Sequence, residues 1–145
     1  MVDLKAPGVV STGIIDKTYG PGFVIYAVPE GENYRIYLKH EKFKQIKFVI
    51  TSSPSMYGGF DEMMQCIMSN VPVLHDTIEM YIKFYFSFDD CRTVKELRYK
   101  SGLRQKDFAE HFGIPLSTFQ KWEQAVNPVP GYVFKMMQTI LKSQA

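Results

Sequence analysis

Cysteine, histidine and tryptophan are scarce in this chain of 145 residues, which has two Cys, three His and one Trp. Cys66 and Cys91 do not form a CxxC motif, and we expect them to be reduced structural thiols of a cytoplasmic protein. The three histidines are scattered, so we expect no metal site and no cofactor. The chain contains no Gly-rich phosphate loop, HExxH motif or nucleophile motif, and these absences predict a protein that is not an enzyme.

Long apolar runs are also missing. None reaches the ~18 residues of a membrane-spanning helix, and the N-terminus lacks the apolar core of a signal peptide, so we expect no membrane partner. The hydrophobic content of 46% is nevertheless sufficient for a buried core. At this length the chain is expected to form one medium domain or two small ones.

The net charge is only +2, but the charges are unevenly distributed. From Arg92 to the C-terminus there are nine Lys/Arg and four Asp/Glu, which gives this segment +5, whereas residues 1–91 carry −3. A basic segment beside an acidic one fits an electrostatic footprint for nucleic acid that is confined to one module. An unevenly charged but purely solvated surface is the alternative.

The N-terminal part contains four stretches whose composition and alternation are typical of β-strands. These stretches are residues 13–19, 22–28, 33–39 and 46–51. Turn residues such as Gly20-Pro21-Gly22 separate them, and two or three hairpins in an antiparallel meander are therefore expected. Residues 1–12 show no periodicity and are expected to be a loose lead-in.

Residues 60–69 and 78–88 follow two different periodicities. The first stretch predicts a helix, because its methionines and Ile67 fall on one side. The second alternates apolar and more polar residues with a period of two, which predicts a long strand rich in aromatic residues. A helix capped by Asp76 with Glu79 as its third residue is the alternative. Exposed aromatic residues on such a strand suggest a dimer interface.

Helical periodicity dominates after residue 92. Thr93 and Glu96 form a capping-box signature, and Gly102 and Gly113 suit left-handed helix ends. The expected helices cover residues 94–101, 105–112, a stretch that starts after Ile114-Pro115 and runs to about 124, and 132–142. The expected shared core is Leu97, Leu103, Phe108, Ala109, Phe112, Ile114, Phe119, Trp122, Val133, Met136 and Met137, and the inward stripe of the last helix also includes Ile140 and Leu141.

The predicted fold class is therefore α+β. An N-terminal antiparallel β-sheet domain with one helix, residues 1–91, precedes a C-terminal all-α helix-turn-helix domain, residues 92–145. The first domain is expected to dimerise the protein or to bind a partner, and the second is expected to bind DNA.

About 50 residues, 93–141, resemble the helix-turn-helix of the phage repressor/Cro (Xre-like) family. The matching elements are Leu97-Arg98, Ser101-Gly102-Leu103, Gln105, Phe108-Ala109, Phe112-Gly113-Ile114, Ser117-Thr118, Trp122-Glu123, Pro128 and Pro130. The resemblance implies a symmetric dimer that reads a palindrome in double-stranded DNA.

The resemblance also implies a set of DNA-binding residues. These are Arg104, Gln105, Lys106, Leu116, Ser117, Thr118, Gln120 and Lys121. Gln105 would lie near the DNA backbone, Gln120 would read an adenine edge, and Lys121 would contact a guanine or a phosphate. Arg104, Lys106 and the amides at the start of their helix would hold phosphates.

The chain departs from the family pattern at three places. Arg104 replaces the usual hydroxyl cap, Pro115 replaces Ser or Thr, and residues 125–127 replace a glycine followed by basic residues. The missing basic residues predict weaker affinity and a flatter salt dependence. A module that has become a protein-interaction or dimerisation domain is the alternative.

Four tyrosines of the N-terminal part lie near a run of lysines. They are Tyr19, Tyr26, Tyr34 and Tyr37, and the lysines are Lys39, Lys42, Lys44 and Lys47. Together they can form an aromatic and basic sheet face that stacks on single-stranded nucleic acid. Ordinary strand tyrosines beside a solvated lysine run are the favoured interpretation.

The sequence thus favours a cytoplasmic, dimeric, sequence-specific regulator of transcription that binds double-stranded DNA. The alternative is an inhibitor or antitoxin from a phage or mobile element. Its N-terminal domain would bind a protein or ribonucleoprotein target, such as a nuclease or toxin, while the helix-turn-helix represses its own operon.

Overall fold

The computed structural model describes residues 2–70 and 72–145, and it divides the chain into two compact units. The first unit comprises Met1–Ile14 and Gly22–Ile78, and the second comprises Ile15–Pro21 and Glu79–Ala145. The boundary between the units therefore falls within one helix, between residues 78 and 79, whereas the sequence predicts a boundary between 91 and 92.

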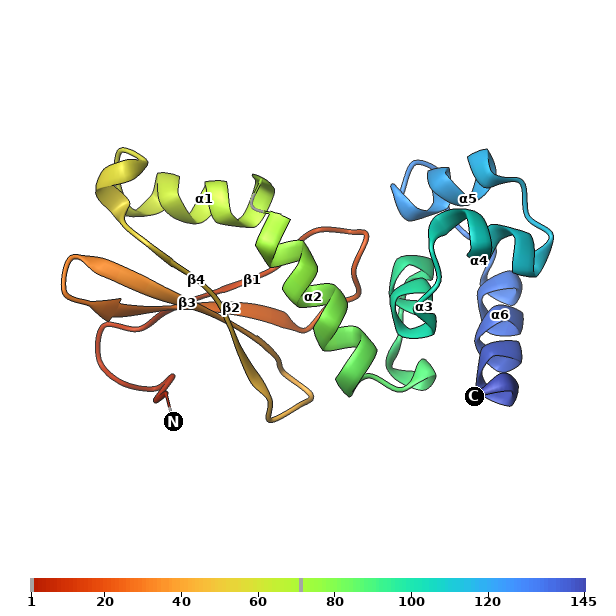
Figure 1. The fold of residues 1–145 in the computed structure, drawn as a ribbon, viewed down its shortest axis with the longest axis horizontal. Helices are drawn as coiled ribbons and strands as arrows, with labels where there is room; N and C mark the ends of the chain where they lie inside the picture. Colours follow the sequence, from red (N-terminus) through yellow and green to blue (C-terminus); the bar gives the residue numbers. More distant parts are fainter. Residues whose placement is uncertain (1, 71) are drawn as a thin grey trace. The chain divides into compact units, whose positions relative to one another are not determined.

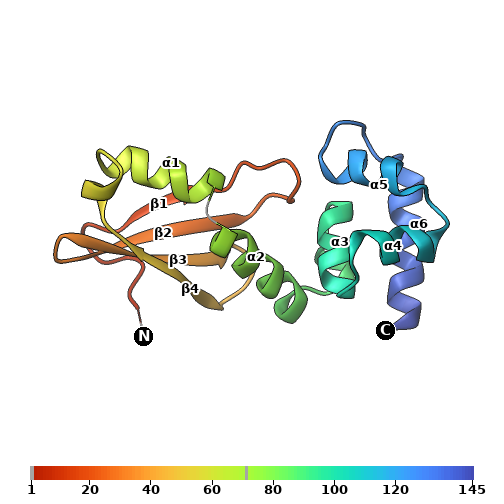
Figure 2. The same ribbon diagram turned by 45° about the horizontal axis from the view of Figure 1, so that its top comes forward.

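The first unit contains a four-stranded antiparallel meander in the order β1-β2-β3-β4 (Figures 1 and 2). The strands are β1 Val10–Gly13, β2 Phe23–Glu30, β3 Asn33–His40 and β4 Ile46–Ser52. Three of the four predicted strands are thus confirmed. The predicted strand at 13–19 is wrong, because β1 pairs earlier and residues 15–21 belong to the second unit. A bulge shifts the register between β3 and β4 beside Ile36 and Tyr37.

Two helices, α1 Phe60–Asn70 and α2 Pro72–Tyr85, follow the sheet (Figure 1). One set of alternating strand residues is buried, and helix residues of the same unit complete the core. These residues are Phe23, Ile25, Ala27, Ile36, Leu38, Val49, Met63, Met64, Ile67, Leu74 and Ile78. The predicted helix at 60–69 is confirmed, and the α+β fold class is confirmed with it.

The strand predicted over residues 78–88 is wrong, because α2 occupies most of this stretch. Burial recurs at Leu74, Ile78, Tyr81 and Ile82, which is a helical spacing. Met80 and Phe84 are apolar but exposed, and they create the false alternation. Because Tyr81 is fully buried and no strand forms there, the dimer interface inferred from this stretch loses its basis.

The second unit is helical apart from its connecting segments. After the short turn η2 Phe88–Asp90 come α3 Val94–Ser101, α4 Gln105–Phe112, α5 Leu116–Glu123 and α6 Gly131–Gln144. Apart from the segment 15–21, its buried apolar residues are Tyr81, Ile82, Phe86, Cys91, Val94, Leu97, Phe108, Ala109, Phe119, Met137 and Leu141. The segment 15–21 belongs to this unit and buries Tyr19 and Gly20.

Helix α6 buries a narrower stripe than its sequence predicts. Met137, Gln138 and Leu141 face the core, whereas Met136 and Ile140 are exposed. The placement of Met136 in the core is therefore wrong. Gln138 takes the inward position because its amide donates a hydrogen bond to the Phe88 carbonyl oxygen at 2.7 Å.

Within residues 2–70 and 72–145, no helix has the length and apolar character needed to cross a membrane.

Candidate nucleic-acid interface

Helix α3 is fixed by caps at both ends. The Thr93 hydroxyl accepts a hydrogen bond from the Glu96 amide, and the Glu96 carboxylate accepts one from the Thr93 amide, which completes a capping box. The same hydroxyl donates to the Thr18 carbonyl oxygen at 2.7 Å, which ties the segment 15–21 to α3. At the other end, Gly102 adopts φ = 76°, a left-handed cap that favours glycine.

Helices α4 and α5 form the predicted helix-turn-helix. Gly113 ends α4 with φ = 65°, and the Ile114 amide donates back to the Ala109 carbonyl oxygen at 2.9 Å. The rings of Phe108 and Phe119 lie 5.0 Å apart between the two helices. Because both rings are fully buried, this contact fixes α5 against α4.

A buried ion pair connects α3 to the end of α5. Arg98 donates from Nε and Nη2 to the two carboxylate oxygens of Glu123, the second bond measuring 3.1 Å. The side chains are only 12% and 4% exposed, respectively. Arg98 also donates from Nη1 to the Leu103 carbonyl oxygen at 3.3 Å. This one guanidinium therefore connects α3, to which Arg98 belongs, with α5 and with the segment between α3 and α4.

The environment of Arg98 keeps it charged. Burial on its own lowers the pKa of the guanidinium, but the hydrogen bonds and negative charge of Glu123 more than offset it, and the pKa of Arg98 is raised. A buried charge of this kind requires its partner, because an unpaired ion in the interior is strongly disfavoured.

Two predicted DNA-binding residues join this ion pair. Gln105 Nε2 donates to the Glu123 carboxylate at 2.9 Å, and Gln120 Nε2 donates to Gln105 Oε1 at 3.4 Å. Both glutamines are half-buried. The structure therefore brings together the start of α4 and the middle of α5 in one network from Arg98 to Gln120.

The other predicted DNA-binding residues project mostly into solvent. Arg104, Lys106, Leu116, Ser117 and Lys121 are exposed, and Thr118 is half-buried. Arg104 precedes α4 and makes no capping bond with its side chain, but it pairs with Asp107 at 3.0 Å. Exposed ion pairs of this kind contribute little to stability, so the guanidinium can exchange this partner for a phosphate.

Two departures from the family pattern have visible structural consequences. Pro115 directly precedes α5 with φ = −56°, so its missing amide is not needed by the helix. Ala125 adopts φ = 56°, a left-handed conformation that is unusual for a residue with a side chain. The chain therefore leaves α5 through a turn better suited to glycine.

The Arg98–Glu123 pair is the feature of the candidate site that sequence reasoning missed. Both residues belong to the motif matches, but 25 positions separate them and nothing in the local pattern assigns them to each other. The sequence offers one signal for this pair: Glu123 lies next to Trp122 at the end of a predicted helix. A buried acidic position on that face requires a basic partner from another helix.

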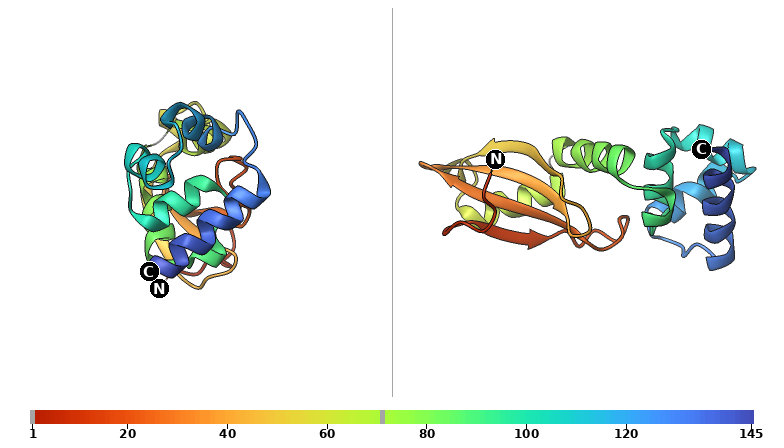
Figure 3. Two further views of the ribbon diagram at one scale, coloured as in Figure 1. Left: turned by 90° about the vertical axis from the view of Figure 1, so that its right-hand side faces the viewer. Right: turned by 90° about the horizontal axis from the view of Figure 1, so that it is seen from below.

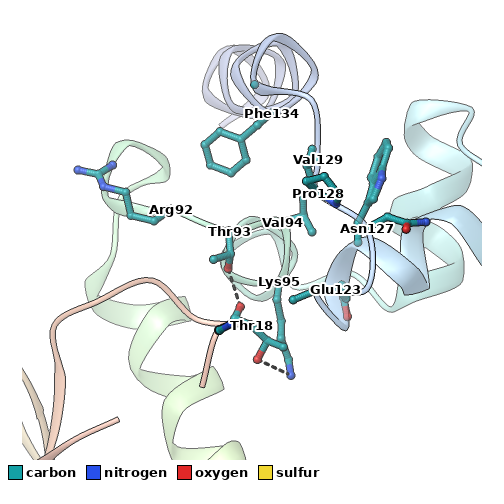
Figure 4. A pocket seen from close by; sticks show the side chains of 14 residues that line it. Thr18, Arg92, Thr93, Val94, Lys95, Glu123, Asn127, Pro128, Val129 and Phe134 are labelled. Atoms are coloured by element: carbon teal, nitrogen blue, oxygen red, sulfur yellow. Dashed lines mark hydrogen bonds between the residues drawn. The ribbon is translucent and has the colours of Figure 1, made fainter. Parts of the chain in front are cut away.

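A cavity of about 530 Å³ lies beside the last turn of α5, where Glu123 is part of its lining (Figure 4). Its lining includes Thr18, Thr93, Lys95, Trp122 and Phe134. Among the lining residues, Lys95 Nζ donates a hydrogen bond to the Thr18 hydroxyl at 3.4 Å. The cavity is thus separate from the exposed residues at the start of α5.

Searches against protein-family models, curated proteins and solved structures find no match to this chain.

Proposed function

We propose that the chain is a sequence-specific regulator of transcription that binds double-stranded DNA with its second unit. The observation that carries the proposal is the two-faced character of α5. Phe119 and Glu123 are buried against α3 and α4, while Leu116, Ser117 and Lys121 remain exposed. A short helix held from behind with a polar and cationic face outward is suited to a DNA major groove.

The hydrogen-bond network prepares Gln120 for base recognition. A glutamine amide has two N–H donors, and only one is used in the bond to Gln105. The remaining donor and the amide oxygen match the edge of an adenine. Because Gln105 is itself held by Glu123, the orientation of Gln120 is set before DNA arrives.

Phosphate contacts are assigned to the cations around α4. Arg104 and Lys106 lie at the start of this helix, where free amides and the helix dipole favour an anion. Leu116 is assigned to a thymine methyl group, and Lys121 to a guanine or a phosphate. Homodimerisation is part of the proposal, because a single helix-turn-helix rarely binds an operator tightly.

Random-site selection with the full chain, at a stated salt concentration, tests this proposal. We expect one enriched sequence with two half-sites, followed by a gel shift on that sequence. Gln120→Ala with Lys121→Ala should weaken binding by about 5- to 150-fold for each base that the variant no longer reads, while circular dichroism remains unchanged.

The matched control is Gln65→Ala with Lys135→Ala, which removes the same residue types from exposed positions of α1 and α6. This control should bind like the parent chain. Failure to enrich any sequence, or equal binding by the α5 double variant, would contradict the proposed function.

A further inference from the structure

The sheet of the first unit has a second face, opposite the buried one. Cross-strand pairs place Ser11 beside Tyr26, Tyr26 beside Tyr37, and Tyr37 beside Phe48. Directly paired residues point to the same face, so these four side chains form one row across all four strands. Figure 3 (right) views the sheet from this side, and the N-terminal segment passes in front of part of it.

The row presents three aromatic rings. Phe48 is 47% exposed, and Tyr26 and Tyr37 are half-buried. The Tyr37 and Phe48 ring centroids are 5.8 Å apart and nearly perpendicular. Neighbouring strands lie about 4.8 Å apart, so the row offers ring surfaces at intervals that successive unstacked bases can reach.

Cations flank the row on both sides. Arg35 lies in the neighbouring row on one side and Lys39 in the neighbouring row on the other. The Arg35 guanidinium is 4.9 Å from the Phe48 ring centroid, and its Nε donates to the Tyr37 hydroxyl at 2.9 Å. Arg35 is therefore held over the rings, where it can meet a phosphate or stack on a base.

The basic residues of the first unit are concentrated in β3, β4 and the turn between them. Residues 35–47 contain five Lys/Arg and one acidic residue, giving +4, while the remainder of the unit carries −5. Of the six acids in that remainder, Asp61, Glu62 and Asp76 belong to the helices α1 and α2, whereas Asp3, Glu30 and Glu32 lie in the N-terminal segment and at the end of β2 or the turn after it. Glu30 pairs with Arg35 at 3.7 Å, but both side chains are exposed, so the pair is weak and exchangeable.

We propose that this face, which we call the ring row and define as Ser11, Tyr26, Tyr37 and Phe48, binds single-stranded RNA together with Arg35 and Lys39. Bases stack on the rings and phosphates meet the two cations. This site goes beyond the double-stranded DNA binding proposed for α5. Lysine is depleted in protein–protein interfaces, so the flanking Lys39 favours a polyanion over a protein partner.

Hydroxyl groups on this face favour RNA over DNA. Ser11 belongs to the ring row, and Thr51 pairs with Arg35 in the next row. Both are exposed, and each can exchange hydrogen bonds with a ribose 2′-hydroxyl.

The structure separates the four tyrosines that the sequence groups together. Tyr26 and Tyr37 belong to the ring row. Tyr34 instead contacts the Phe60 ring of α1 at 4.9 Å, and Tyr19 is buried in the second unit. Phe48, which the sequence grouping omits, is the most exposed ring of the row.

Fluorescence anisotropy of a labelled oligouridylate about 12 nucleotides long tests the RNA site with the full chain. Phe48→Ala should raise the Kd about 5- to 150-fold, while Phe48→Trp, which retains a stacking surface, should bind within a few-fold of the parent chain. Lys39→Gln should flatten the dependence of log Kd on log salt by about 0.7.

The control variant is Phe84→Ala, which removes an equally large ring that is 62% exposed on α2. It should bind oligouridylate like the parent chain, and so should the Gln120→Ala, Lys121→Ala double variant. If the double variant still binds oligouridylate, the RNA site is separate from the operator-binding helix. Either proposal can then fail without the other.

Four results would overturn the RNA site. They are undiminished binding by Phe48→Ala, an equal loss in Phe84→Ala, equally tight binding of oligothymidylate, and no binding of oligouridylate. If binding is absent and Phe48→Ala also lowers the molar mass measured by light scattering, the ring row is a protein interface instead.

Discussion

Glu123 has several structural roles at once in the proposed DNA-binding unit. It is nearly fully buried, it pairs with Arg98, and it accepts a bond from Gln105. A buried pair of this kind is costly to break, because removing one partner leaves the other charge desolvated. Glu123 therefore governs both stability and the placement of Gln120.

Replacement of Glu123 tests this dual role. We expect Glu123→Gln to lower the free energy of unfolding by about 3–5 kcal/mol, because Arg98 stays charged without its counter-ion. Urea denaturation followed by circular dichroism measures this change. Combining Arg98→Met with Glu123→Leu should cost less than Glu123→Gln alone, since no unpaired charge remains.

Glu110→Gln is the matched control, because Glu110 is an exposed acid on α4. Its effect should stay within about 0.5 kcal/mol. A Glu123→Gln effect as small as that of the control would show that the buried pair does not stabilise the unit.

At the scale of elements, α6 carries an exposed apolar stripe next to its buried one. Tyr132, Met136 and Ile140 are spaced four residues apart and are exposed, and they line a shallow groove with Lys135 and Thr139. The neighbouring Met137 is buried. Met136 and Met137 are therefore the same residue type in the same helix, but one is exposed to solvent and the other is buried in the core.

This difference predicts unequal effects of the same substitution. Met137 is 2% exposed, and Met137→Ala should lower the free energy of unfolding by about 2–5 kcal/mol, because a cavity remains in the core. Met136, at 58% exposed, should change stability by less than about 0.5 kcal/mol. Thermal unfolding of Met136→Ala and Met137→Ala measures both, and similar losses would show that α6 buries a different face.

The elements that the sequence predicts accurately are those with local end signals. The bounds of α3 and α4 are as predicted, because Thr93, Gly102 and Gly113 define helix ends through bonds to residues within one or two turns. Nothing comparable fixes which face of a helix is buried. Periodicity alone places Met136 in the core, and only the packing of α6 decides between it and Gln138.

Helix α2 shows that periodicity can also predict the wrong type of element. Met80 and Phe84 are apolar at solvent-facing positions, so a helix imitates a strand in the sequence. Pro72, the first residue of the helix, is the local signal for a helix, because proline is favoured at that position. In the candidate site, the exposed cations follow from the motif, whereas the bonds of Gln105 and Gln120 depend on a residue from another helix.

At the scale of the whole molecule, charge separates the two units only weakly. The second unit carries eleven Lys/Arg and eight Asp/Glu, a net +3, and the first carries −1. A field this small steers DNA poorly, so affinity must come from a few local phosphate contacts. The proposed regulator is therefore expected to depend on individual lysines and arginines.

The salt dependence of operator binding tests how local these contacts are. Lys106→Gln should reduce the slope of log affinity against log salt by about 1, because the protein then neutralises one phosphate fewer, and should weaken all DNA sequences about equally. Lys135→Gln removes the same charge from an exposed position on α6 and should leave the slope unchanged. Titrations at several salt concentrations distinguish the two variants. If both lowered the slope equally, net charge rather than the surface around α4 would control binding, and the assignment of phosphates to α4 would fail.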